Sequence, residues 1–417
     1  MSTAPTDSRP PRRRRVVVLL VLLLVAALAA LAGWWASRDA DADESGASAT
    51  LEAPLGEEFY TAPEDVIADG EHGSLIWSRQ QTSSAVAGAT TYLVLYRSVG
   101  ASGEPVAVSG TVMIPDGEPP AGGWPVLSWG HGTTGTADQC APSRGVLPGT
   151  ANFYTGLMNQ VYGQYVGRGY AVVATDYEGL GTPGPHPYLM GESAGRAMTD
   201  IVSAARELDD GVSGTWLAAG HSQGGQAALF TAQSTDGYGD GLDLAGIVAL
   251  APPSQLGQGL DSGLAAGGRT VFLAPIISSA AAVAGLAPED VFTPRAVERL
   301  PDLEETCLDG LSDDGAIGSL TPRQLLRADA DRGPVEEVVT QNDASVLDPT
   351  VPVLVVQGVA DETVPVRTTD ALAKQYQRRD VDLTYERVPG RNHVDVLTDA
   401  QAIVDSWVQE DLPQLPG

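Results

Sequence analysis

The feature that most constrains the fold of this chain is the sequence Gly-His-Ser-Gln-Gly-Gly at residues 220–225. It follows an apolar run at residues 215–219 and precedes a helix-like run at residues 226–230. A G-x-S-x-G pattern between a strand and a helix is typical of a sharp turn, in which the glycines let the serine adopt unfavourable dihedral angles. The pattern predicts a nucleophilic Ser222 at the carboxyl end of a strand. An ordinary loop in a glycine-rich chain is the alternative.

A serine nucleophile needs a general base, usually a histidine that a carboxylate orients. With this turn the chain order is serine, acid, histidine, so the base must follow Ser222. Of the five histidines only His393 does, and it comes just after strand-like residues 383–388. The apolar run at residues 351–358 leads into Asp361, which we take as the acid. The neighbouring Glu362 is the alternative.

The loop Gly-His-Gly-Thr-Thr-Gly at residues 130–135 follows another apolar run. Acyl transfer places negative charge on an oxygen, and each backbone N–H group aimed at that oxygen contributes about 3 kcal/mol. We expect these donors to be Gln223, which follows the nucleophile, and Thr133 in this loop. We expect His131 to shape the loop, because the chain order assigns the base to His393. A plain glycine-rich turn is the alternative.

The rest of the chain alternates strand and helix patterns. Residues 91–96 and 105–114 alternate like an antiparallel pair, and buried-strand patterns then recur between helical ones at residues 124–129, 170–175, 215–219, 245–252 and 351–358. Such an alternation indicates a mostly parallel sheet with helices on both faces. The sequence therefore predicts an α/β-hydrolase fold.

The alternation breaks at about residues 253–350, which predicts a helical insertion lying over the site. It is either a lid that binds an acyl chain or an ordinary helical elaboration. Its bulky apolar segment, which includes Phe272, either lines an acyl tunnel or belongs to a core. The Gly/Pro-rich stretch that includes Tyr177 lies at the same edge as the serine turn. It either lines the substrate entrance or only turns the chain.

The first residues are expected to direct export rather than to fold. A basic segment (residues 1–15) precedes an apolar run (residues 16–35) that is long enough to span a membrane, and an acidic linker (residues 36–57), expected to be disordered, precedes a catalytic domain at residues 58–417. An Ala-Leu-Ala sequence near the end of the run fits signal cleavage, so the segment is either an anchor or a removed signal. The catalytic part lies outside the cytoplasm in both cases.

The two cysteines, Cys140 and Cys307, are expected to pair as a disulfide in an oxidising compartment, with two free buried thiols as the alternative. A balance of 53 acidic to 24 basic residues argues against binding to nucleic acid or to anionic surfaces. No cluster of histidine, cysteine and aspartate has metal-ligand spacing, so we expect no metal. The sequence does not specify an oligomeric state.

Three motifs together resemble the secretory lipase family of α/β hydrolases, the family of fungal lipase A: residues 130–135 with Cys-Ala-Pro-Ser at 140–143, residues 174–181 (Ala-Thr-Asp-Tyr-Glu-Gly-Leu-Gly), and residues 220–225. The resemblance covers about residue 55 to the end. It implies an ester hydrolase for acylglycerols or related esters, with a helical lid, no cofactor, and Ser222, Asp361 and His393 as nucleophile, acid and base.

Two features depart from the fungal pattern, namely the N-terminal apolar segment and the His-Gly-Thr-Thr sequence of the oxyanion loop. The second departure leaves the identity of the second oxyanion donor open. Three functions follow as hypotheses: a lipase or carboxylesterase acting on a small-molecule or lipid ester, an acyltransferase that uses the same acyl-enzyme, and a non-catalytic binding protein on a hydrolase fold.

Overall fold

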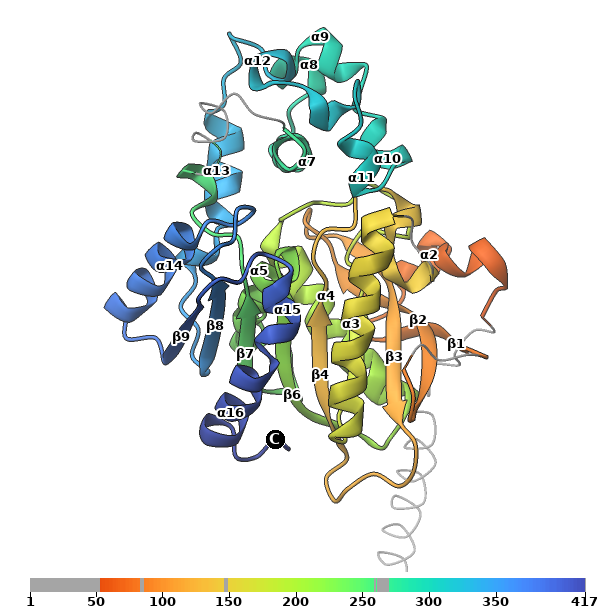
Figure 1. The fold of residues 1–417 in the computed structure, drawn as a ribbon. Coiled ribbons are helices and arrows are strands. Elements are labelled where there is room, and N and C mark those ends of the chain that lie inside the picture. Colours follow the sequence, from red (N-terminus) through yellow and green to blue (C-terminus); the bar gives the residue numbers. More distant parts are fainter. Residues whose placement is uncertain (1–52, 83–85, 146–148, 259, 261–269, 417) are drawn as a thin grey trace, which may run out of the picture. The chain divides into compact units, whose positions relative to one another are not determined.

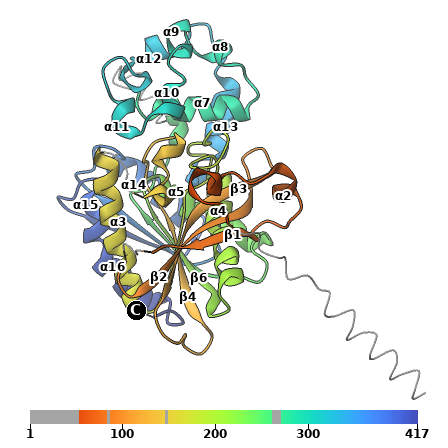
Figure 2. The same cartoon turned by 90° about the vertical axis from the view of Figure 1, so that its right-hand side faces the viewer.

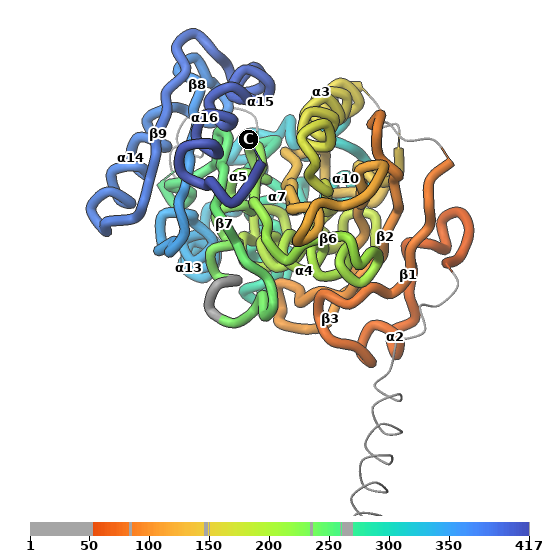
Figure 3. Tube along the Cα trace, turned by 90° about the horizontal axis from the view of Figure 1, so that it is seen from below, coloured from red at the N-terminus to blue at the C-terminus, as the bar shows by residue number. Residues whose placement is uncertain are grey.

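The computed structural model describes residues 53–82, 86–145, 149–258, 260 and 270–416 of the chain. Its centre is a nine-stranded sheet in the order β1-β2-β3-β5-β4-β6-β7-β8-β9, and Figure 3 shows β1 and β9 at opposite edges. Pairing is antiparallel from β1 to β5 and parallel from β5 to β9. The sheet is therefore mostly parallel, as the sequence predicts.

The strands follow the apolar runs of the sequence closely. They are β1 (Leu75–Gln80), β2 (Ala89–Val99), β3 (Pro105–Pro115), β4 (Trp124–Gly130), β5 (Ala171–Thr175), β6 (Val212–His221), β7 (Asp243–Leu250), β8 (Val353–Gly358) and β9 (Leu383–Val388). Every residue of β5 and of β8 is buried, because helices cover the sheet on both faces. The strand β1 was not predicted, since its sequence Leu-Ile-Trp-Ser-Arg-Gln does not alternate.

Helices form a layer on each face of the sheet (Figures 1 and 2). One layer holds α4 (Gly191–Leu208), α5 (Gln223–Phe230) and α14 (Val366–Arg378), and the other holds α3 (Gly149–Gly167), α15 (Asp395–Asp399) and α16 (Gln401–Asp411). The helix α4 packs closely on the sheet because small residues such as Ala197, Ala204 and Ala205 form its buried face. The architecture is that of an α/β hydrolase.

Short helices between β7 and β8 gather beyond the carboxyl ends of the parallel strands (Figure 1). They are α7 (Leu273–Val283), α8 (Pro288–Val291), α9 (Pro294–Val297), α10 (Asp302–Glu305), α11 (Leu308–Leu311), η5 (Ile317–Ser319), α12 (Pro322–Leu325) and α13 (Gly333–Gln341). We call them the cap. The cap has its own apolar cluster, with Phe292 and Leu325 fully buried in it. Shorter elements outside the cap are η1 (Gly56–Tyr60), α2 (Glu64–Ala68), η2 (Asp138–Cys140), η3 (Pro142–Arg144), η4 (Thr231–Asp236) and η6 (Ala344–Val346).

A disulfide joins Cys140, in the segment after β4, to Cys307 in the cap, which is the predicted pairing. Backbone contacts reinforce this link. Leu308 N–H donates to the carbonyl oxygen of Thr134 over 3.0 Å, and the Thr136 hydroxyl donates to the carbonyl oxygen of Leu303 over 2.5 Å. The cap is thus fastened to the loop that carries Thr133.

The predicted membrane segment at residues 16–35 lies outside the described residues, as does most of the predicted linker. The last linker residues are described, and Gly56–Tyr60 forms a 3-10 helix in which Phe59 is fully buried. This 3-10 helix therefore starts within the last two residues of the predicted linker. None of the helices in the described part of the chain has the length and apolarity that a membrane crossing requires.

Candidate active site

Ser222 occupies a strained turn between β6 and α5, with φ 57° and ψ −121°. A non-glycine residue in this region costs roughly 1–3 kcal/mol, which the surrounding structure must offset. The flanking glycines are sterically required. A Cβ atom on Gly220 would lie 2.1 Å from the carbonyl oxygen of Gly224, and one on Gly224 would lie 1.9 Å from that of Gly130. Backbone packing among β4, β6 and α5 therefore dictates the glycine spacing of the motif.

The structure brings the three predicted residues of the triad together. Ser222 Oγ lies 2.9 Å from His393 Nε2, and His393 Nδ1 lies 2.7 Å from Asp361 Oδ2. These residues follow the carboxyl ends of β6, β9 and β8, which meet at one edge because the strands are parallel. The alternative acid, Glu362, is exposed. His393 is thus placed to donate to Asp361 and to accept the serine proton.

Asp361 is held as a carboxylate by several donors. Its Oδ1 accepts the N–H groups of Thr363 and Val364, each over 2.8 Å, and its Oδ2 accepts the side-chain amide of Gln357 over 2.9 Å. Burial acts to raise the pKa of Asp361, but the hydrogen bond and charge of His393, with the other donors, lower it overall. The sequence reasoning missed Gln357. Its signal is a lone amide in the otherwise apolar strand β8.

The side chains of both predicted oxyanion residues, Gln223 and Thr133, form hydrogen bonds. Gln223 begins α5, where backbone N–H groups have no acceptor within the helix. Its side-chain amide donates to Nε2 of His186 over 2.9 Å, and burial lowers the pKa of His186 to about 4. The hydroxyls of Thr133 and Tyr188 share a hydrogen bond of 2.7 Å. His131 is buried in the same loop, where its Nδ1 donates to the carbonyl oxygen of Gly132 over 2.7 Å.

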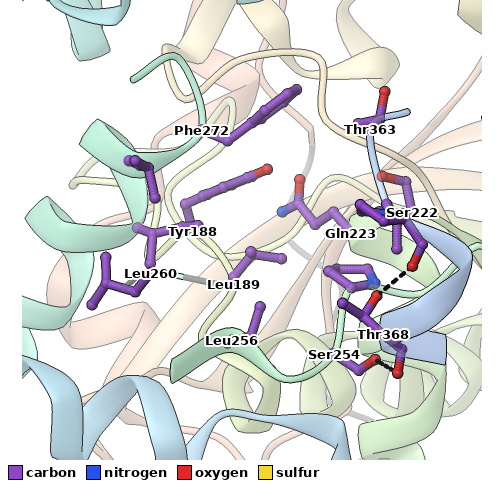
Figure 4. Close-up of a pocket in the computed structure, with 15 residues that line it drawn as sticks. Tyr188, Leu189, Ser222, Gln223, Ser254, Leu256, Leu260, Phe272, Thr363 and Thr368 are labelled. Atoms are coloured by element: carbon purple, nitrogen blue, oxygen red, sulfur yellow. Dashed lines mark hydrogen bonds between the residues drawn. The ribbon is translucent and has the colours of Figure 1, made fainter. Parts of the chain in front are cut away.

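A largely apolar pocket opens at Ser222, between the turn and the start of α7 (Figure 4). The lining residues are Tyr188, Leu189, Ser222, Gln223, Pro253, Ser254, Leu256, Leu260, Phe272, Leu273, Ile276, Thr363, Val364, Pro365 and Thr368. Phe272, Leu273 and Ile276 come from the cap, so the cap supplies one wall of the pocket. Phe272 lies in that wall, and an acyl tunnel formed by its segment stays a prediction.

Tyr177 lies elsewhere, so its expected place at the substrate entrance needs correction. Its side chain is 1% exposed, and its hydroxyl donates to the carbonyl oxygen of His131 over 2.8 Å. The Tyr177 ring therefore packs against the loop after β4 and supports it. Tyr188, from the same Gly/Pro-rich stretch, lines the pocket instead.

Sequence reasoning also missed Tyr154 of α3 and gave no role to His221. The Tyr154 hydroxyl lies 3.0 Å from His221 Nδ1, and His221 Nε2 lies 2.8 Å from the carbonyl oxygen of His393. Burial, with a smaller effect of the nearby His393, lowers the pKa of His221 to about 3. The position of His221 directly before Ser222 was the available signal. Within the described residues, no group of three or more histidine, cysteine or acidic side chains could hold a metal ion.

The fold and the arrangement of serine, histidine and aspartate define an α/β hydrolase with a triad-like site. The family model described as "Secretory lipase" matches residues 155–414. The chain belongs to the secretory lipase family.

Relatives at the sequence level are distant. The chain is 24% identical over 374 residues to Lipase A of Arthroderma benhamiae, covering 80% of this chain and 74% of that protein. It is 26% identical over 326 residues to a Mycobacterium tuberculosis protein named "Probable inactive lipase", covering 73% and 70%. Family membership alone therefore does not establish catalysis.

Two solved structures share the fold. The closed state of Candida antarctica lipase A aligns with a TM-score of 0.71 and 19% identity, covering 88% of each chain. The rice cell wall degrading esterase LipA of Xanthomonas oryzae aligns with a TM-score of 0.66 and 22% identity, covering 83% of this chain and 100% of that one.

The buried His221 should make stability depend on pH. The unfolded imidazole, with a pKa of about 6.5, binds a proton as the pH falls, whereas the folded one stays neutral until about pH 3. The contribution of His221 to the free energy of unfolding is therefore fully present above about pH 6.5. Below that pH it falls by about 1.4 kcal/mol per pH unit. Relative to His221→Gln, the wild-type unfolding free energy should drop by about 2 kcal/mol between about pH 7 and pH 5 in urea titrations. A difference that does not change with pH contradicts a neutral His221.

Proposed function

We propose that the protein is a serine ester hydrolase, a lipase or carboxylesterase, that works through an acyl-enzyme on Ser222. The observation that carries the proposal is the hydrogen-bonded chain from Asp361 through His393 to Ser222, which ends at the mouth of an apolar pocket. A nucleophile, a base and an orienting carboxylate in this order are the components that acyl transfer requires.

In the first half of the reaction, Ser222 Oγ attacks the ester carbonyl carbon while its proton passes to His393 Nε2. Asp361 stabilises the imidazolium that forms. The carbonyl oxygen becomes an oxyanion, for which the N–H groups of Gln223 and Thr133 are the proposed donors. When the tetrahedral intermediate collapses, the alcohol leaves with the proton from His393. Water then attacks the acyl-enzyme by the same route and releases the carboxylic acid.

The pocket favours an ester with an apolar acyl group. Leucine, isoleucine, phenylalanine and proline side chains from the cap and from the β7 and β8 ends dominate its lining beside Ser222. Burial of methylene groups contributes about 0.8 kcal/mol for each group, so an acyl chain gains affinity with length. The secretory lipase family and the relative named Lipase A support a lipid ester as the substrate, and we propose acylglycerols or related esters.

The name of the Mycobacterium tuberculosis relative makes a non-catalytic member of the family the main alternative. An acyltransferase would form the same acyl-enzyme and pass the acyl group to an alcohol instead of water. Product analysis with and without an added alcohol separates transfer from hydrolysis, and an inert protein gives neither product.

Substitution of the triad tests the mechanism. Ser222→Ala should lower kcat for p-nitrophenyl butyrate by roughly 10³-fold or more with the thermal unfolding midpoint retained, because the nucleophile is removed from a preformed site. Asp361→Asn should cost a similar factor, since the imidazole loses its orienting carboxylate. Glu362→Gln serves as the matched control and should stay within about twofold of wild type. Activity retained by Ser222→Ala would exclude the acyl-enzyme. A larger loss of kcat in Glu362→Gln than in Asp361→Asn would assign the acid role to Glu362.

Phe272 tests the acyl pocket. A charge in the pocket wall opposes burial of a long acyl chain but scarcely affects an acetyl group, so Phe272→Asp should lower kcat/KM for palmitate esters at least about tenfold more than for acetate esters. The control is Phe153→Asp, because Phe153 is 62% exposed on α3 and does not line the pocket. A series of p-nitrophenyl esters measures the chain-length preference of each variant, and melting curves measure its stability. Equal losses on all esters together with a lower melting temperature would place Phe272 in a core.

We also propose that residues 16–35 take the chain to the membrane and that the hydrolase domain acts outside the cytoplasm. The basic residues before the apolar run and the secretory family support this. The full-length chain should stay with membranes through a carbonate wash, and external protease should release a soluble active fragment by cutting at residues 36–57. A mature protein that begins at Gly33 would contradict the anchor and support a cleaved signal.

A further inference from the structure

A second chain of hydrogen bonds lies next to the triad and ends at the backbone carbonyl of His393. Gly132 N–H donates to the Tyr154 hydroxyl over 2.8 Å. The hydroxyl lies 3.0 Å from His221 Nδ1, and His221 Nε2 lies 2.8 Å from the carbonyl oxygen of His393. The side chains of Tyr154 and His221 are buried, so water does not compete for these bonds.

The chemistry of the two ends fixes the position of every proton in this chain. An amide N–H can only donate, so the Tyr154 oxygen accepts from Gly132. A carbonyl oxygen can only accept, so His221 carries its proton on Nε2 and donates to His393. His221 Nδ1 is then the unprotonated nitrogen of a neutral ring, and it accepts the hydroxyl proton of Tyr154. All four groups are satisfied only in this arrangement.

The chain joins the elements that must be aligned for the reaction. Gly132 belongs to the loop after β4, next to Thr133, and Tyr154 belongs to α3. His221 precedes the nucleophile, and the His393 carbonyl belongs to the base itself. Gly132 allows this close approach, because a Cβ atom there would lie 2.8 Å from the Tyr154 hydroxyl oxygen and 3.2 Å from His221 Nδ1.

We propose that Tyr154 and His221 are positioning residues for the reaction at Ser222, which hold the base and the oxyanion loop in register with the nucleophile through this chain of hydrogen bonds. The proposal rests on the proposed function. The bond from His221 fixes the backbone of His393, while Asp361 fixes its imidazole ring. The base is thereby held at both its main chain and its side chain.

The neutral form of His221 also suits the charge that develops. The ring centroids of His221 and His393 are 4.7 Å apart, and His393 becomes positively charged when it takes the serine proton. A second positive charge at this distance would oppose that step. Because Nδ1 accepts from Tyr154, a proton on His221 would also break the chain.

Substitutions that keep or remove individual hydrogen bonds test the proposal. Tyr154→Phe removes one hydroxyl and keeps the ring. His221→Leu fills much of the space but neither donates nor accepts, whereas His221→Gln can accept from Tyr154 and donate to His393. Tyr162→Phe is the matched control, because Tyr162 is also buried on α3 but its hydroxyl donates to the sulfur of Met158, over 3.7 Å, and not to His221.

With p-nitrophenyl butyrate, Tyr154→Phe and His221→Leu should each lower kcat about 10- to 100-fold, because small misplacements of reacting groups cost that much, while KM stays within about twofold. His221→Gln should recover most of the loss, and Tyr162→Phe should match wild type. The double variant Tyr154→Phe/His221→Leu should be no slower than the slower single variant, since both break one chain.

The outcomes separate the two proposals. Wild-type turnover that depends on Ser222, combined with an unchanged kcat in a folded Tyr154→Phe variant, overturns the positioning role alone. Absence of turnover that depends on Ser222 in wild type overturns the proposed function and the positioning role with it. If His221→Leu does not fold, the comparison of kcat between Tyr154→Phe and Tyr162→Phe decides whether the positioning role holds. Imidazole ¹⁵N NMR of wild type should show the proton of His221 on Nε2, and a proton on Nδ1 overturns the chain.

Discussion

The site depends on backbone packing between β4, β6 and α5. Gly130, Gly220 and Gly224 approach so closely that no side chain fits between them, and this contact forces Ser222 into its strained turn. The same contact places the loop after β4 beside Ser222, and the proposed oxyanion donors come from this loop and from the start of α5. The strain costs roughly 1–3 kcal/mol, which the buried central strands offset. The stability of the sheet thus maintains the strained backbone conformation of Ser222.

The loops that carry Asp361 and His393 also pack closely against each other. A Cβ atom on Gly358, at the end of β8, would lie 2.4 Å from the carbonyl oxygen of Arg391, so glycine lets the base loop lie against the acid loop. Asn392 then accepts the N–H groups of Val394 and Asp395, each over 2.9 Å, and closes the turn that carries His393. The cap, fastened by its disulfide to the segment after β4, adds an apolar wall to the pocket. Fixed loops and a fixed cap wall together pre-organise the site.

Much of the fold and the triad could be predicted because both rest on short-range patterns. Buried parallel strands are continuous apolar runs, and the Gly-x-Ser-x-Gly spacing records a backbone contact directly. Residues that act through long-range contacts left no such pattern. Tyr154 looks like one more aromatic on the buried face of α3, Gln357 looks like an interruption in β8, and Tyr177 looked like a pocket residue because of its neighbours in sequence. Their roles follow from contacts between segments that are distant in sequence. Only the folded chain specifies these contacts.

The central claim is that Ser222 becomes covalently acylated. Diethyl p-nitrophenyl phosphate reacts with an activated serine to give a stable phosphoryl ester, so it tests this directly. Intact-mass and peptide mass spectrometry should find one diethylphosphoryl group per chain, on the peptide that contains Ser222, and esterase activity should fall in proportion to the modified fraction. Modification of another residue in parallel with inactivation, or full esterase activity after Ser222 is modified, would contradict the account.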